Sequence, residues 1–370
     1  MLSLAAFGST QRRISLEFGS KEIVDPPLPP PTGELLAPGS RFTRTEIERL
    51  FEIDSPLLAE NPYALSGPPN TVRARRSDWR MFLQFCFGRH YMPLPAAPVV
   101  VREFLEQSFL GADPKSAATV QRYLSSIAYA HKLADLPDPT KTARVRGAYR
   151  HLSRKLPGSQ PKAALRNTHI GYALGHLKTD NVGWDLRAKA LLAVAYCTMG
   201  RRAELVALRV EDLSFNSSTS DGVALIRNTK AGREESRYLS AEAVTHVKAW
   251  LTHANVKDGA VFRRFTPRRT VGQAAIAPQE VARIVQRAGA MLNNECDTSA
   301  CPWPSDHISA HSTRIGAAHD LAASGIDLTS IMHSGGWTDP KMPRYYTREL
   351  AAKESGMARM LKAEKAKAQD

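Results

Sequence analysis

Cysteine is scarce in this chain of 370 residues, which contains only Cys86, Cys197, Cys296 and Cys301. Four scattered cysteines do not make the disulfide framework of a small secreted protein, and they favour a reducing, intracellular setting. The sequence also lacks an apolar run long enough to span a bilayer. It has no Walker motif and no clear cluster of carboxylates, so it shows no sign of ATP-dependent or metal-dependent chemistry.

Acidic residues are outnumbered by basic ones. The chain has 50 Lys and Arg against 36 Asp and Glu, which gives a formal net charge of +14. A basic excess of this size favours a polyanionic partner, most commonly nucleic acid, with an anionic membrane surface as the alternative. The length is sufficient for two domains, each with its own core.

The first 60 residues predict a disordered N-terminal arm. Their apolar start is too short for a secretory signal, and the acidic residues that follow it argue against a transit peptide. Five prolines between residues 26 and 31 impose an extended segment. A weak helix is expected only at residues 43–52.

Residues 61–155 predict a small helical domain. Apolar residues recur at helical spacing in segments 70–86, 116–134 and 139–155, and Pro98 opens a further helix; Asn70 is the expected N-cap of the first. Arginines flank these apolar stripes. A solvated charged face is the alternative for any single helix, but the repetition favours DNA contact. The candidate residues are Arg73, Arg76, Arg80, Arg122, Arg144 and Arg150.

Residues 156–163 are a linker by composition, and residues 164–370 predict a second domain. Segment 185–199 indicates a nearly fully buried helix, and residues 223–239 indicate strand, turn and strand, with Lys230 at the turn. An ordinary exposed lysine is the alternative there. Arg268 and Arg269, in a loop with proline, are further candidates for DNA contact. The expected fold class is mainly α with a small antiparallel β-sheet.

The segment from residue 311 to residue 346 indicates a chemical site. His311 and Arg314 are three residues apart, a spacing that places both on one face of a helix, where they can bind one anionic group. A tyrosine hydroxyl, with an ordinary pKa of about 10, needs such cations to attack a phosphate. The pattern therefore predicts phosphoryl transfer to a tyrosine.

Zinc is the alternative use of this region. Cys296, Cys301, His307 and His311 are metal-ligand types. However, the cysteine pair and the histidine pair are only a few residues apart, prolines stiffen the gap, and His311 already has another role. We expect no metal and no cofactor.

Taken together, these parts resemble a tyrosine recombinase of the phage-integrase superfamily, from about residue 65 to the end. Arg201 fits the family pattern Arg-x-x-Glu-Leu, whereas Arg202 would leave Glu204 one residue too near. Of two adjacent tyrosines, the spacing from the tryptophan selects Tyr346 over Tyr345. The matching residues are Arg201, Glu204, Lys230, His311, Arg314, Trp337 and Tyr346.

The resemblance implies an activity and roles for these residues. Tyr346 would attack a DNA phosphate to form a 3′-phosphotyrosine, Arg201 and Arg314 would bind the non-bridging oxygens, and Lys230 would protonate the leaving 5′-oxygen. His311 would exchange protons, Trp337 would donate to the phosphate and pack the site, and Glu204 would orient it or form a buried salt bridge.

The resemblance further implies a cytoplasmic homotetramer, encoded by a bacterium, phage or plasmid, that acts on paired inverted-repeat sites in double-stranded DNA through a Holliday junction. An apolar stripe of Met357, Met360 and Leu361 suits docking on a neighbouring protomer, with docking on its own protomer as the alternative. A type IB topoisomerase or telomere resolvase would use the same chemistry, and a non-catalytic DNA-binding protein could keep the same fold.

Overall fold

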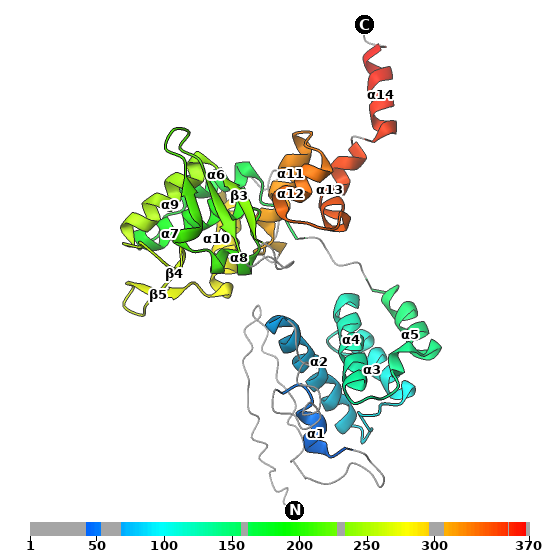
Figure 1. Ribbon diagram of the computed structural model, residues 1–370. Helices are drawn as coiled ribbons and strands as arrows, with labels where there is room; N and C mark the ends of the chain where they lie inside the picture. Colours follow the sequence, from blue (N-terminus) through cyan, green and yellow to red (C-terminus); the bar gives the residue numbers. More distant parts are fainter. Residues whose placement is uncertain are drawn as a thin grey trace, which may run out of the picture. The chain divides into compact units, whose positions relative to one another are not determined.

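A computed structural model describes residues 42–52, 68–156, 162–227, 234–295, 307–353 and 355–367. They form two compact units, divided between Ser159 and Gln160. Helices predominate in both units, and the described strands form two small antiparallel sheets, so the predicted fold class is confirmed (Figure 1). Among the described helices, none has the length and apolar character needed to cross a membrane.

The N-terminal unit is a helical bundle around an aromatic core that includes Trp79, Phe82 and Phe104. The helices predicted over this region are present. The expected N-cap is wrong: Pro68 is the N-cap of the second helix, and Asn70 lies in its first turn. The first helical residue is Pro69, a position where proline is well tolerated. The helices are α1 (Arg44–Glu48), α2 (Pro69–Phe87), α3 (Pro98–Leu110), α4 (Ala117–Leu133), the 3₁₀ turn η2 (Pro139–Lys141) and α5 (Ala143–Ser153).

Residues 42–52 pack into this core, although the sequence placed them in the N-terminal arm. Ile47, Leu50 and Phe51 are fully buried or nearly so, because their spacing puts them on one face of a short helical segment. Trp79 donates its indole N–H to the carbonyl of Ile47 at 2.8 Å, which fixes α1 against α2. The weak helix expected here is therefore part of the bundle.

The C-terminal unit is built around α7 (Val182–Cys197), which is buried on most sides, as its apolar composition predicted. It packs against α6 (Asn167–His176), α9 (Ala241–His253) and α11 (Ser312–Ala323). The remaining helices are α8 (Arg202–Ala207), α10 (Pro278–Glu295), α12 (Leu328–Gly335), α13 (Lys341–Lys353) and α14 (Gly356–Lys367).

Two antiparallel sheets complete this unit. The first has the order β1 (Leu213–Phe215), β2 (Gly222–Ile226) and β3 (Glu235–Leu239), with Ala224 paired to Arg237. β2 and β3 are the two paired strands that the sequence predicted, and the turn predicted between them lies outside the described residues. The second sheet pairs β4 (Arg263–Phe265) with β5 (Val271–Ala275).

The start of the C-terminal unit is fastened to α11. The Leu165 amide donates to the carbonyl of Ser312 at 2.9 Å. A Cβ at Gly316 would lie 1.8 Å from the Leu165 carbonyl oxygen, so only glycine permits this crossing. The helix that carries Arg314 is thereby held by the first residues after the linker.

We expect Ile47→Ala to lower the free energy of unfolding of the N-terminal unit by about 2–5 kcal/mol, because it opens a cavity in a buried core. Urea unfolding of the full chain, followed by tryptophan fluorescence, measures the change. Leu110→Ala on α3 is the matched control: its side chain is 63% exposed, and the same loss of atoms should change stability by less than about 0.5 kcal/mol. Equal effects of the two substitutions would contradict the packing of α1.

Candidate active site

Arg201 lies at the N-terminal end of α8, and its conformation is fixed by a buried carboxylate. Its Nη1 donates to Glu204 Oε1 at 2.6 Å, and its backbone N–H donates to Glu204 Oε2 at 2.8 Å. Its Nη2 donates to the carbonyl of Gly336 at 3.2 Å. The side chain keeps 24% of its surface exposed, so part of the guanidinium can receive an anion from outside.

Arg314 reaches the same place from α11. It is buried, and its Nη2 donates to the carbonyl of Gly335 at 2.6 Å, while its Nη1 donates to the carbonyl of Met199 at 2.5 Å. Its guanidinium carbon lies 3.9 Å from the centroid of the Trp337 ring, which is a cation–π contact. Two arginines that are distant in the sequence therefore donate to adjacent carbonyls, those of Gly335 and Gly336.

Both glycines are required by this geometry. Gly336 has φ +61, in the left-handed region, where it ends α12. A Cβ at Gly335 would lie 2.1 Å from the ring of Trp337. The backbone at the end of α12 can thus pass between the tryptophan and the arginines only without side chains.

Tyr346 lies on α13 beside these groups. Its ring centroid is 6.1 Å from that of Trp337, and it packs against the small cluster formed by Met199, Ala317, Ala318 and Ile331. Burial raises the pKa of Tyr346, although Arg314 and Arg201 oppose the shift. The group is therefore a neutral phenol at pH 7 and needs a base to become a nucleophile.

Tyr345, in contrast, is 39% exposed and stacks with Arg348, whose guanidinium carbon lies 4.4 Å from its ring centroid. The two neighbouring tyrosines therefore differ in surroundings, as adjacent positions on a helix must. Pro343 lies in the first turn of α13, where its missing N–H removes no helical hydrogen bond.

His311 is the N-cap residue of α11, one residue before the helix proper, and it is partly exposed to solvent. Desolvation on its inner side and the positive charges of Arg314, Arg202 and Arg201 lower the pKa of His311, against the opposing effect of Glu204. A neutral imidazole at pH 7 is able to accept a proton.

The positive charge of the site is not fully neutralised. Burial, together with repulsion from Arg201 and Arg237, lowers the pKa of Arg314 to about 9, and Glu204 only partly offsets this. An anion bound between Arg201 and Arg314 would relieve the repulsion. The arrangement is therefore suited to a phosphate.

Arg237 was missed by the sequence analysis. It lies on β3, is buried, and contacts both Glu204 and the backbone at the end of α7. The available signal was the alternation of the strand, which points Arg237 and Leu239 inward. An arginine at an inward position needs buried partners, and such partners commonly occur at functional sites.

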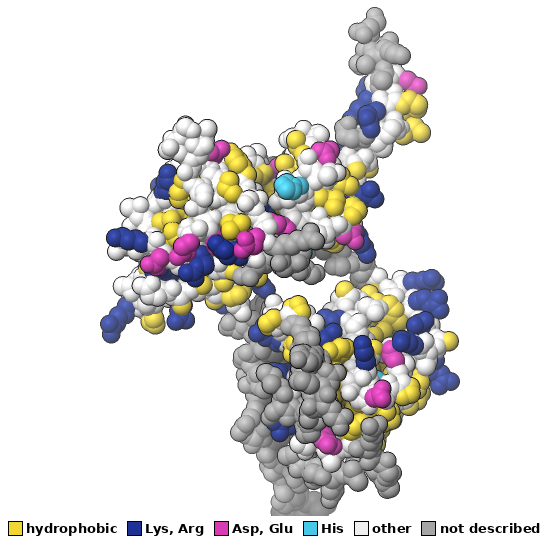
Figure 2. Space-filling view, viewed as in Figure 1, with side chains coloured by type: hydrophobic (Ala, Val, Ile, Leu, Met, Phe, Trp, Pro, Cys, Tyr) yellow, Lys and Arg dark blue, Asp and Glu magenta, His cyan; other side chains and the backbone are white. Residues whose placement is uncertain are grey.

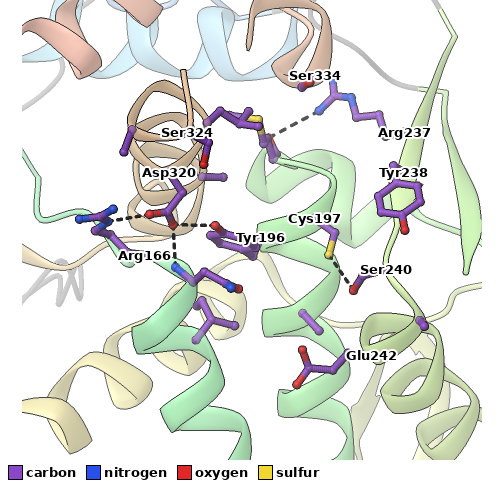
Figure 3. A pocket seen from close by; sticks show the side chains of 18 of the residues that line it. Arg166, Tyr196, Cys197, Arg237, Tyr238, Ser240, Glu242, Asp320, Ser324 and Ser334 are labelled. Atoms are coloured by element: carbon purple, nitrogen blue, oxygen red, sulfur yellow. Dashed lines mark hydrogen bonds and ion pairs between the residues drawn. The ribbon is translucent and has the colours of Figure 1, made fainter. Parts of the chain in front are cut away.

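A second network lies on the side of α11 that faces α6 and α7 (Figure 3). Asp320 accepts hydrogen bonds from Arg166 Nε at 2.6 Å, the Asn167 amide at 2.7 Å and the Tyr196 hydroxyl at 2.6 Å. Burial would raise the pKa of Asp320, but these hydrogen bonds outweigh it and the pKa is lowered. The network holds α11, and with it Arg314, against the body of the unit.

Several predicted residues lie outside the described residues. They are Lys230, in the segment between β2 and β3, and the two cysteines of the zinc alternative, Cys296 and Cys301. Within the described ranges, no three His, Cys, Asp or Glu side chains are grouped as metal ligands.

The candidate DNA-contact arginines fall into two groups. Arg76, Arg122 and Arg269 form ion pairs with Glu52, Asp78 and Asp180, respectively. The others, Arg73, Arg80, Arg144, Arg150 and Arg268, form no ion pair with a described carboxylate. All of the candidates except Arg76 are exposed. Figure 2 shows Lys and Arg side chains gathered on the side of the N-terminal unit that carries α5.

The sequence and the fold are similar to those of known proteins. Residues 174–353 match the model of the Phage integrase family. The chain is 28% identical over 310 residues to Recombinase cre of Escherichia phage P1, covering 76% of this chain and 87% of that protein. It is 27% identical over 319 residues to an integrase/recombinase XerD homolog of Selenomonas ruminantium, covering 82% of this chain and 89% of that protein.

Many solved structures share the fold, and two of them serve as examples. The Tn1549 transposon integrase in complex with transposon right end DNA has a TM-score of 0.58 at 15% identity, covering 81% of this chain and 94% of that one. The XerH site-specific recombinase bound to palindromic difH substrate has a TM-score of 0.54 at 16% identity, covering 76% and 79%.

We expect the imidazole of His311 to titrate below its ordinary pKa of about 6.5 in the free protein, because desolvation and three guanidinium groups disfavour its protonation. Filling the site with sulfate should raise the midpoint. Since the unfolded chain binds the proton more tightly, His311 lowers stability as the pH falls below about 6.5. Nitrogen-detected NMR titration measures the midpoint, with His311→Gln to assign the signal; a midpoint at or above the ordinary value would contradict the electrostatic description.

Proposed function

We propose that the chain is a member of the tyrosine recombinase superfamily, as its motifs indicated, and a site-specific DNA recombinase that cleaves and rejoins DNA through a 3′-phosphotyrosine. One observation carries the proposal: Arg201 and Arg314 donate to the adjacent carbonyls of Gly336 and Gly335, with Tyr346 packed beside them. Two planar guanidinium groups so placed suit the two non-bridging oxygens of one phosphodiester.

In the proposed cleavage step the Tyr346 oxygen attacks the phosphorus in line with the 5′-oxygen. A bond from phosphorus to the tyrosine oxygen forms while the bond from phosphorus to the 5′-oxygen breaks. His311 takes the phenolic proton, and Lys230 gives a proton to the leaving 5′-oxygen. One phosphoester replaces another, so the exchange needs no cofactor, and the reverse step rejoins a new 5′-hydroxyl.

The surroundings of each group support these roles. The raised pKa of Tyr346 leaves it protonated before attack, and the lowered pKa of His311 leaves it free to accept that proton. Trp337 stacks on Arg314 and packs against Tyr346, so one ring positions a phosphate ligand and the nucleophile together. Glu204 orients Arg201 through its side chain and its backbone.

We infer double-stranded DNA as the partner. The formal charge of +14 and the exposed arginines Arg73, Arg80, Arg144 and Arg150 of the N-terminal unit support binding to the phosphate backbone. Arg268 on the β4–β5 connection would add a contact from the C-terminal unit. Arg76, Arg122 and Arg269 would have to exchange or share their carboxylate partners to contact DNA.

We further infer a homotetramer that acts on paired inverted-repeat sites in the bacterial cytoplasm through a Holliday junction. On α14, Met357, Met360 and Leu361 expose 63%, 48% and 53% of their surfaces, and their spacing puts them on one face of the helix. A groove of about 1020 Å³ on the C-terminal unit has Ile170, Leu174, Ala193, Ala317 and Leu321 among its lining residues. The stripe of one protomer would dock in the groove of its neighbour.

We expect Tyr346→Phe to abolish covalent attachment to DNA, because it removes the attacking oxygen and leaves the ring packed against Trp337. The assay uses a nicked DNA site that traps the adduct, which is counted on a denaturing gel. Tyr345→Phe is the matched control and should retain the wild-type yield, since that hydroxyl lies outside the cluster.

Two outcomes would contradict the assignment. Adduct from Tyr346→Phe at the wild-type yield would exclude Tyr346 as the nucleophile. Absence of adduct from the wild-type protein on every duplex tested, with binding retained, would favour a DNA-binding protein without catalysis.

We expect Met360→Gln combined with Leu361→Gln to weaken assembly on DNA at least about tenfold, because burying two amides without partners costs more than about 1.4 kcal/mol. Mass photometry of protein on DNA with two sites counts protomers. Arg359→Gln, on the opposite face of α14, is the control and should leave assembly unchanged. Binding of one protomer to one half-site should be the same for all three proteins; unchanged assembly by the double variant would argue against docking between protomers.

A further inference from the structure

Arg237 is a buried arginine that the mechanism above does not use. Its side chain is only 2% exposed, so the guanidinium cannot reach DNA. Its Nη1 donates to the carbonyl of Thr198 at 2.8 Å, and its Nη2 donates to Glu235 Oε2 at 2.7 Å. These partners come from the end of α7 and from β3 itself, so Arg237 ties the sheet to the segment that leads into Arg201.

The first link from Arg237 to the site runs through Glu204. Arg237 Nη1 lies 3.6 Å from Glu204 Oε2. The same carboxylate accepts two hydrogen bonds from Arg201, one from the side chain to Oε1 and one from the backbone N–H to Oε2. Glu204 is fully buried and lies between two cations. Without Arg237 one side of this carboxylate loses its positive partner, and the orientation that it gives to Arg201 changes.

The second link runs through Met199. Its carbonyl accepts from Arg314 and also lies 3.5 Å from Arg237 Nη1. Met199 has φ +48, a left-handed conformation that is uncommon outside glycine and asparagine. Such a conformation persists only when its surroundings hold it in place, and two guanidinium groups do so here.

The third contact is with the turn at Gly335 and Gly336, whose carbonyls accept hydrogen bonds from Arg314 and Arg201. A Cβ at Gly336 would lie 2.4 Å from Arg237 Nη2 and 2.2 Å from Glu235 Oε2. The pair formed by Arg237 and Glu235 is therefore the surface on which the Gly336 backbone rests. The carbonyl of that residue is the acceptor for Arg201.

We propose that Arg237 is a positioning residue for DNA cleavage, which holds Glu204, Met199 and Gly336 so that Arg201 and Arg314 face the same phosphate. The inference rests on the proposed function, because it concerns the rate of the step in which Tyr346 attacks DNA. A purely structural arginine would affect how much protein is folded, but it would leave the folded molecules as fast as before.

Single-turnover cleavage of nicked DNA by saturating protein separates these two effects. The amplitude of adduct formation reports the folded, active fraction, whereas the rate constant reports the geometry of the site. We expect Arg237→Met to lower the rate constant about 100-fold, as for a displacement of catalytic groups by about 1 Å. Arg237→Lys keeps the charge but cannot bridge the same partners, and should lower the rate constant roughly tenfold.

Arg187 on α7 provides a matched control. Its side chain is 0% exposed, its Nη1 donates to the carbonyl of Arg263 at 2.7 Å, and its Nη2 pairs with Glu280. It precedes Met199 by 12 residues, a distance of about 18 Å along a helix. Arg187→Lys should reduce the amplitude or the melting temperature and leave the rate constant within about twofold of wild type.

A stereochemical measurement adds a second readout. Sulfur in place of either non-bridging oxygen of the scissile phosphate perturbs contacts with Arg201 and Arg314, so the ratio of cleavage rates for the two diastereomers reports their placement. Arg237→Lys should change this ratio, and Arg187→Lys should not.

The outcomes are distinguishable. The inference is supported if the wild-type protein forms the adduct and only the Arg237 variants show a slower rate constant and a changed diastereomer ratio. If the wild-type protein forms the adduct and Arg237→Lys matches Arg187→Lys in both the rate constant and the diastereomer ratio, the inference is overturned and the proposed function stands. No wild-type adduct overturns both. If Arg237→Met gives no folded protein, Arg237→Lys decides.

Discussion

Repulsion among three neighbouring guanidinium groups, two of them buried, is the constraint on which the C-terminal unit depends. Arg201, Arg237 and Arg314 meet within one small region, and removing such ions from water costs several kcal/mol each unless hydrogen bonds replace the lost solvent. The fold supplies them from two carboxylates, Glu204 and Glu235, and from backbone carbonyls at the ends of α7 and α12. Carbonyls hold the cations without neutralising them, so net positive charge is kept for an anionic substrate.

This use of carbonyls explains why helix ends, rather than helix centres, form the site. A helix interior has no free carbonyl, whereas the last turn leaves several without an intrahelical partner. The end of α7 offers Thr198 and Met199, and the end of α12 offers Gly335 and Gly336. Both helix ends have left-handed backbone, at Met199 and Gly336. The burial of α7 and the hydrogen bonds of Asp320 on α11 hold these elements in place.

Much of this site could be predicted from the sequence, because its parts are local patterns. Arg201 and Glu204 are one helical turn apart, and Trp337 follows two glycines. Arg237 could not be found in this way, since its partners are distant in the sequence and only the sheet brings them near Glu204. The packing of residues 42–52 was missed for a similar reason: Ile47 finds its core only across a gap of about 30 residues, at Trp79. Arginines in a sequence predict positive charge but not which carboxylates will pair with them. The ion pairs of Arg76 with Glu52 and of Arg122 with Asp78 were therefore not predicted.

The same balance of charge couples substrate binding to the integrity of the catalytic unit. In the proposed function, repulsion between Arg201 and Arg314 is only partly offset, by groups that include Glu204 and the carbonyl dipoles, before DNA binds. A phosphate between them adds the missing negative charge, so it binds more tightly to the folded arrangement than to any other, and ligand binding of that kind stabilises the folded state. A phosphodiester in which negative charge is growing at the non-bridging oxygens gains more from the two fixed guanidinium groups than the ground state does. In the proposed reaction, holding like charges together would thus be the source of preference for the transition state, and the groups that hold them, Glu204 and Arg237, would be as necessary as Arg201 and Arg314.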